Sequence, residues 1–140
     1  MYKLVKYITK VNYRDFSTYY LFYKGRKILI PIEIYNEKDT ATPTIYNSIK
    51  RILKAVGFSV IGIKVYRFSE NIFYTYVTLK KENLEFDVNL SFKDAVEISK
   101  ETSSPIFIKN SILQSCGIEI TRDMVIKALK DNSSDGYLDK

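Results

Sequence analysis

The sequence contains no histidine, and this absence excludes more chemistry than any other feature of its composition. Without imidazole, the chain cannot build a Ser-His-Asp triad, use a histidine general base or bind zinc through histidine nitrogens. A general base would have to be a carboxylate, a lysine or a tyrosine. Any metal site would use carboxylate and carbonyl oxygens, which are the ligands of hard cations such as magnesium (Mg) or manganese (Mn).

Cysteine and long apolar runs are also scarce. The single cysteine, Cys116, excludes an internal disulfide and fits a reducing cytoplasm. Its position on an apolar helix face is more typical of a small core residue than of a nucleophile. No apolar run is long enough to cross a bilayer, and the lysines among the first ten residues do not fit a signal peptide. We therefore expect a cytoplasmic protein that has no membrane partner.

The positive charge of the chain is unevenly distributed. The net charge is +6, and residues 1–55 carry 11 Lys/Arg against 4 Asp/Glu, a net of +7, whereas the remainder carries 11 against 12, a net of −1. A basic half favours an anionic partner such as DNA or RNA. The alternative is a lysine-rich surface that only maintains solubility.

The first part of the chain predicts a three-stranded antiparallel meander followed by a helix. Residues 2–13, 17–23 and 27–34 have strand composition, and we expect Gly25 to supply a positive φ in the second turn. Pro31 places the third strand at an edge or a bulge. The helix is predicted to begin with Thr42 as N-cap and to end at Gly57. Its apolar stripe comprises Ile45, Ile49, Ile52, Leu53 and Val56.

The second part predicts another meander, over residues 58–68, 72–79 and 84–90, that leads into a strand–helix–strand unit. The unit spans Phe86 to Ile108, with Ser91 as the helix N-cap, and favours parallel pairing of its two strands. Two short helices follow, the second capped by Thr121. The predicted fold is α+β, with two antiparallel β-meanders each followed by a helix and a C-terminal strand–helix–strand unit. We expect a single domain over residues 1–130 and a flexible acidic tail over 131–140.

Five short motifs follow one another along roughly residues 1–113. They read Ile30-Pro31-Ile32, Val56-Gly57, Phe73-Tyr74, Asp94-Ala95 and Pro105-Ile106. In this order they resemble the bifunctional nuclease domain family of small α+β proteins, and the most specific of them is the Asp-Ala pair that opens a helix ending in Pro-Ile. The resemblance implies metal-dependent nuclease activity on DNA or RNA, with Mg or Mn as the cation.

The departures from the family pattern fall on polar positions. The Arg-Pro-Ser-Asp of the family reads Ser91-Phe92-Lys93-Asp94, and its strand aspartate is replaced by Asn89. The family's Thr-His-Asp reads Ile45-Tyr46-Asn47, so the histidine is lost. Core positions match whereas these polar positions do not. The alternative function is therefore a catalytically inactive relative that acts as an oligomeric binding or regulatory module.

Acidic residues around the second helix start are the candidate catalytic and metal-binding groups. Asp94, Glu97 and Asp87 are the candidate catalytic residues, and Asp94, Asp87 and Asn89 are the candidate metal ligands. If the strand end and the helix start converge, these side chains could hold one divalent cation that activates water for phosphodiester cleavage. The structural alternative is that Asp94 completes a capping box with Ser91 and complements the helix dipole.

Basic and aromatic residues are the candidate contacts to nucleic acid. Lys50, Arg51 and Lys54 form a basic helix face that can contact phosphates, although such a face is often only solvated. Several strand tyrosines could stack on unpaired bases, although aromatic residues on strands more often form core or an oligomer interface. They are Tyr19, Tyr20, Tyr23, Tyr74 and Tyr76. Aromatic strands that are apolar on both faces favour a homo-oligomer, most often a dimer.

Overall fold

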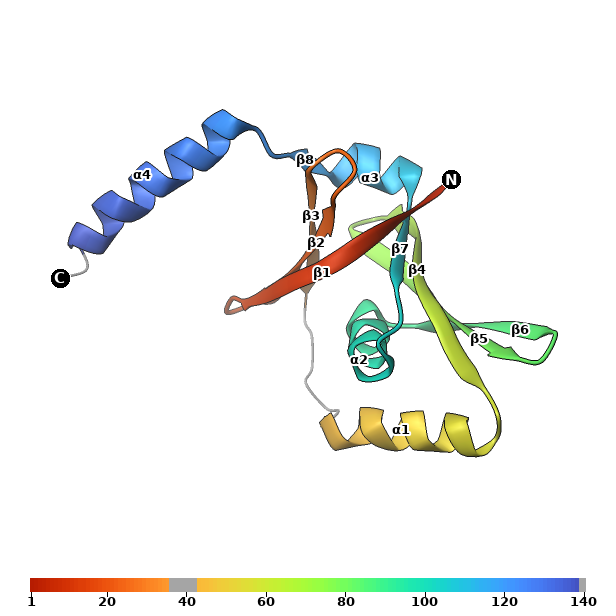
Figure 1. Ribbon diagram of the computed structural model, residues 1–140. Coiled ribbons are helices and arrows are strands. Elements are labelled where there is room, and N and C mark those ends of the chain that lie inside the picture. The colour runs from red at the N-terminus through yellow and green to blue at the C-terminus, as the bar shows by residue number, and fades with distance from the viewer. Residues whose placement is uncertain (36–42, 139–140) are drawn as a thin grey trace.

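The computed structural model describes the backbone of residues 1–35 and 43–138 and the side chains of residues 1–35 and 45–130. Within these ranges the chain is α+β, as predicted: eight strands form one sheet in the order β6-β5-β4-β7-β1-β2-β3-β8, and helices accompany it (Figure 1). The elements are β1 Tyr2–Asn12, β2 Phe16–Tyr23, β3 Ile28–Tyr35, α1 Pro43–Ala55, β4 Ser59–Ser69, β5 Ile72–Lys81, β6 Leu84–Leu90, α2 Phe92–Thr102, β7 Ile106–Lys109, α3 Asn110–Cys116, β8 Ile118–Glu119 and α4 Arg122–Leu138.

The first predicted meander is confirmed, since β2 pairs antiparallel with both β1 and β3. Strand β1 has two partners. Its residues Lys6–Asn12 pair with β2, whereas Tyr2–Val5 pair antiparallel with β7. Strand β1 therefore joins the two halves of the sheet.

The second turn of this meander differs from the prediction in the residue that adopts positive φ. Lys27, at φ 53°, is in the left-handed region, and Gly25 is not. A Cβ at Gly25 would lie 2.6 Å from the Tyr23 hydroxyl, so a larger residue there would require the Tyr23 side chain to move. The expectation for Pro31 is supported: β8 pairs with β3 only at Ile28 and Leu29, so the missing Pro31 donor interrupts no ladder on that side.

The second meander is also confirmed, but the pairing predicted for the strand–helix–strand unit is wrong. Strand β7 pairs in parallel with β4, and β5 and β4 lie between β6 and β7. Strands β6 and β7 point in the same direction, as a crossover requires, without being neighbours. The helix can span this distance because the buried side chains of α2 cover β4 and β5, with which α2 is in contact.

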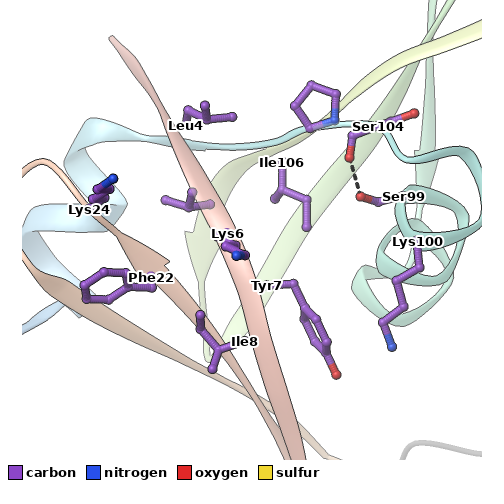
Figure 2. Close-up of a pocket in the computed structure, with 12 residues that line it drawn as sticks. Leu4, Lys6, Tyr7, Ile8, Phe22, Lys24, Ser99, Lys100, Ser104 and Ile106 are labelled. Carbon is purple, nitrogen blue, oxygen red and sulfur yellow. Dashed lines mark hydrogen bonds between the residues drawn. The ribbon is translucent and has the colours of Figure 1, made fainter.

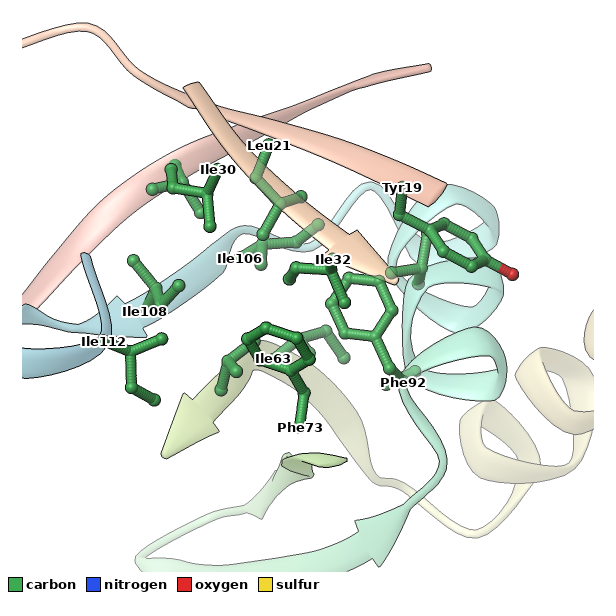
Figure 3. Packing of buried hydrophobic residues seen from close by; sticks show 14 of the residues in the cluster. Tyr19, Leu21, Ile30, Ile32, Ile63, Phe73, Phe92, Ile106, Ile108 and Ile112 are labelled. Atoms are coloured by element: carbon green, nitrogen blue, oxygen red, sulfur yellow. The ribbon is translucent and has the colours of Figure 1, made fainter. Parts of the chain in front are cut away.

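The core lies between α2, α3 and the inner face of the sheet (Figure 3). Tyr19 packs edge-on against Phe92, with ring centroids 5.1 Å apart, and so joins β2 to the start of α2. Alternation along β5 turns Phe73, Thr75 and Val77 inward, as predicted. This inner face meets the apolar side of α2, which includes Ala95 and Ile98.

Helix α1 begins at Pro43, and the predicted Thr42 cap lies outside the described residues. The helix ends as predicted: Gly57 has a φ of 85°, and the Phe58 amide donates to the Leu53 carbonyl at 2.8 Å. The predicted apolar stripe is only partly buried, because α1 packs against α2 by one side, through Tyr46, and leaves Ile45, Ile52 and Val56 exposed.

The C-terminal part differs from the prediction in two respects. A short strand, β8, follows Gly117, and the helix capped by Thr121 continues to Leu138. The backbone of residues 131–138, within the expected tail, continues this helix. None of the helices in the described ranges is long and apolar enough to cross a membrane.

Candidate functional site

Asp94 lies at the start of α2 and links this helix to α1. Its backbone amide donates to the Ser91 hydroxyl oxygen at 3.2 Å, so the predicted N-cap is present. Its carboxylate accepts a hydrogen bond from the Tyr46 hydroxyl at 2.7 Å. Tyr46 is buried and stands where the resemblance places the family's histidine. Two positions that belong to family motifs therefore meet, and here they form a tyrosine–aspartate hydrogen bond.

Asp87 and Asn89 lie on the opposite side of the sheet from α2. The pairing of β6 with β5 places them beside Thr78 and Tyr76. These two residues alternate with the inward-facing Thr75 and Val77 and so belong to the other face of β5, where Thr78 is itself buried. Asp87 accepts a hydrogen bond from the Thr78 hydroxyl at 2.8 Å, and Asn89 accepts one from the Tyr66 hydroxyl at 2.9 Å. The sheet therefore separates this pair from Asp94.

Glu97 lies one helical turn after Asp94 on α2. It pairs with Lys100, one turn further along α2, at 3.3 Å. The expected convergence of Asp87, Asn89, Asp94 and Glu97 on one cation does not occur. In the part of the chain that the structure describes, no three Asp, Glu or Cys side chains lie close enough together to hold a metal ion.

The predicted basic face is present on α1. Lys50, Arg51 and Lys54 are all exposed, and α1 packs against α2 on the helical side of the sheet. This basic face and the pair Asp87–Asn89 are therefore on different sides of the molecule. The two groups that the sequence suggested as parts of one site do not face a common cleft.

The predicted stacking tyrosines fall into separate environments. Tyr19 is fully buried and belongs to the core, so it cannot stack on a base. Tyr20 and Tyr23 are half-buried in the first meander. Tyr74 and Tyr76 are half-buried on the outer face of β5, as the alternation predicted.

Aromatic and cationic side chains gather on this outer face of β4 and β5. The Tyr66 ring lies 5.1 Å from the Tyr76 ring and 6.3 Å from the Tyr74 ring, measured between centroids. The Arg67 guanidinium lies 5.2 Å from the Tyr74 centroid, and the Lys64 ammonium 5.8 Å from that of Tyr76. We call these five residues, Lys64, Tyr66, Arg67, Tyr74 and Tyr76, the tyrosine face.

Tyr2, from β1, extends the tyrosine face. Burial raises the pKa of Tyr2 to about 12, and a hydrogen bond with Tyr76 adds to the increase, whereas nearby Lys64 opposes it. Lys64 lies 5.3 Å from the Tyr2 centroid and so between two rings. Tyr2 is therefore neutral at physiological pH, and Lys64 and Arg67 bring positive charge to the face.

Sequence reasoning missed Lys64, Tyr66 and Arg67. The signal was available, because Ile63 and Val65 alternate with Lys64 and Tyr66 and therefore assign the latter pair to the outer face. The position of Arg67 was harder to predict, since the register shifts between Val65 and Arg67. Chemically, aromatic rings beside cations can stack on unpaired bases and contact phosphates.

Comparison with known proteins agrees with the resemblance in the sequence. A profile of the bifunctional nuclease domain matches residues 27–121, which begin just before β3 and end just before α4. No curated protein matches the chain. The matched range includes α1, α2 and the tyrosine face, and it spans more than half of the sequence. The chain therefore belongs to the bifunctional nuclease domain family.

Proposed function

We propose that this chain binds single-stranded DNA or RNA on its tyrosine face and does not hydrolyse it. The observation that carries the proposal is the contact of the Tyr66 ring with those of Tyr74 and Tyr76, with Lys64 and Arg67 beside them. Both cations are within reach of a backbone whose bases lie on the rings. Stacking on an aromatic side chain stabilises binding by about 1–3 kcal/mol per base and tolerates any sequence.

The loss of hydrolysis is proposed from the engagement of each candidate carboxylate. Asp94 is held by Tyr46, Asp87 by Thr78, and Glu97 by Lys100. Each contact engages one oxygen of its carboxylate, and a single divalent cation would have to draw together groups from both sides of the sheet. A tyrosine hydroxyl at the family's histidine position gives Asp94 a role in joining α1 to α2.

The binding proposal can be tested by fluorescence anisotropy with labelled single-stranded and duplex oligonucleotides at fixed salt. Replacing Tyr74 with leucine removes one stacking ring, so we expect binding of the single strand to weaken roughly 5- to 100-fold. Tyr35→Leu is the matched control, since Tyr35 is an exposed tyrosine of β3 that packs against Phe16. Equal affinities for wild type and Tyr74→Leu, or a preference for duplex, would reject the proposal.

The second candidate function is metal-dependent cleavage of DNA or RNA. The family match favours it, and so does the presence of Asp94 in the family's Asp-Ala motif. Incubation of labelled DNA and RNA with Mg or Mn, comparing wild type with Asp94→Asn, separates the two functions. Cleavage that disappears in the variant would establish the nuclease and overturn our proposal. An intact substrate with wild-type protein agrees with a binding protein.

A further inference from the structure

Helix α4 presents apolar side chains away from the rest of the molecule. It leaves the sheet after β8 and extends outward (Figure 1). Met124, Val125 and Leu129 share one side of the helix and are 44%, 46% and 62% exposed, whereas Ile126, Lys127 and Lys130 lie toward the other side. Helices of this length gain most of their stability from packing an apolar face. The exposed apolar side of α4 therefore identifies a surface that is suited to contact another element.

The direction in which α4 leaves the body is fixed on both sides of the junction. The Ile120 amide donates to the Lys27 carbonyl at 2.8 Å, and the Met124 amide donates to the Thr121 hydroxyl at 3.2 Å. These bonds hold the start of α4 beside the turn between β2 and β3. In this arrangement the apolar side of α4 lies away from its own sheet and is open to a second molecule.

A groove over β1 has the matching character. Its volume is about 780 Å³, and Figure 2 shows Phe22 and Lys24 on one side of β1 and Ile106 and Lys100 on the other. Leu4 and Ile8 are 59% and 50% exposed in it. The serine hydroxyls at the rim of the groove already donate hydrogen bonds within the protein. The Ser99 hydroxyl donates to the Ser104 carbonyl, and the Ser104 hydroxyl donates to the Val60 carbonyl. The groove therefore offers mainly apolar surface.

The charge of the groove is opposite in sign to that of residues 131–140, which follow the apolar part of α4. Lys6, Lys24 and Lys100 line the groove. Residues 131–140 carry three aspartates and one lysine, so they are acidic. Opposite charges on two surfaces of one chain favour contact between copies and set its orientation.

We propose that α4 of one copy packs into the β1 groove of a second copy, and that the exchange is reciprocal. Met124, Val125 and Leu129 of each helix would cover Leu4 and Ile8 of the other copy. Because both copies give a helix and receive one, the assembly closes as a twofold dimer. This proposal is independent of nucleic-acid binding, since the tyrosine face contributes none of the contacts.

The full chain can be tested by size-exclusion chromatography with light scattering and by native mass spectrometry. We expect a dimer for wild type and a monomer for both Val125→Glu, on the helix, and Leu4→Glu, in the groove. Each change buries a charge in the proposed interface. Ile72→Glu is the matched control, because Ile72 is 52% exposed at the start of β5, and it should remain dimeric. Circular dichroism would verify that all variants fold.

Mixing the two monomeric variants tests the exchange itself. Val125→Glu retains an intact groove and Leu4→Glu retains an intact helix, so a mixture can form one of the two contacts. We expect a heterodimer in the mixture that neither variant forms alone. A monomeric wild type, with or without a copurified small molecule in the groove, would overturn the proposal. So would dissociation by only one of the two variants, which would indicate helix–helix pairing or another surface.

Discussion

Strands β3 and β6 occupy the same place in their meanders, yet their apolar residues have different environments. In β3, Ile28, Ile30 and Ile32 are 5%, 0% and 0% exposed. In β6, Leu84, Phe86 and Val88 are 59%, 46% and 40% exposed. Both strands alternate apolar and other residues, so their patterns alone predict a buried face for each. The comparison teaches that alternation identifies a strand and its two faces, but not what covers either face.

The difference arises from position in the sheet. Strand β3 lies next to β2 and in contact with α3, whose Ile112 and Leu113 are buried in the same core. Strand β6 is the last strand of the sheet and is paired only with β5. Helix α2 packs against β4 and β5, so little of it reaches the edge strand β6. Burial therefore depends on long-range topology.

The largest expected effect comes from truncating a buried side chain of β3. Ile30→Ala should destabilise the fold by about 2–5 kcal/mol, because it removes buried contacts and leaves a cavity. Leu84→Ala is the matched change on β6 and should alter the free energy of unfolding by less than about 1 kcal/mol, given its exposure. Urea unfolding measures both. Equal losses would show that β6 is as well covered as β3, for example within an oligomer.

The next effect concerns the contact between α1 and the start of α2, the helix that follows β6. Tyr46→Phe removes the hydroxyl that donates to Asp94 and should destabilise by about 1–2 kcal/mol, because the bond is partly buried and has a charged acceptor. Combining it with Asp94→Asn in a double-mutant cycle should give losses that are clearly less than additive. Additive losses would mean that the two side chains act separately.

A smaller effect is expected at Ser91, which lies between the exposed strand β6 and helix α2. Ser91→Ala removes the acceptor for the Asp94 amide and should destabilise by about 1 kcal/mol. Ser91→Asp supplies another capping oxygen and should recover most of this loss. Thermal unfolding followed by circular dichroism measures both variants. Failure of aspartate to rescue would assign the serine a role other than capping.

The smallest effect links the two meanders through Tyr2 of β1 and Tyr76 of β5. Because the pKa of Tyr2 in the fold is about 12 and that of an unfolded tyrosine is about 10, the folded state holds the proton more tightly. Its contribution to stability is complete below about pH 10 and is lost as pH rises through about 12. Unfolding measured across this interval should depend less on pH in Tyr2→Phe. An unchanged dependence would contradict the linkage.

Local sequence signals predicted most of the elements but not the assembly of the candidate site. The caps at Ser91 and Thr121, the end of α1 at Gly57 and the faces of β5 all follow from interactions within a few residues. The separation of Asp87 from Asp94 depends on which face of a strand meets which helix. Although only seven positions apart in sequence, they lie on opposite sides of the sheet. The tyrosine face depends on the register between β4 and β5, which two irregularities alter.

The double pairing of β1 has a consequence for the order in which the chain is completed during synthesis. The partner of Tyr2–Val5 in β7 is made only about a hundred residues after them. The part of β1 that pairs with β2 meets its partner almost at once. The same strand thus contains one contact of low sequence separation and one of very high separation, and its ladder with β7 is among the last that can close.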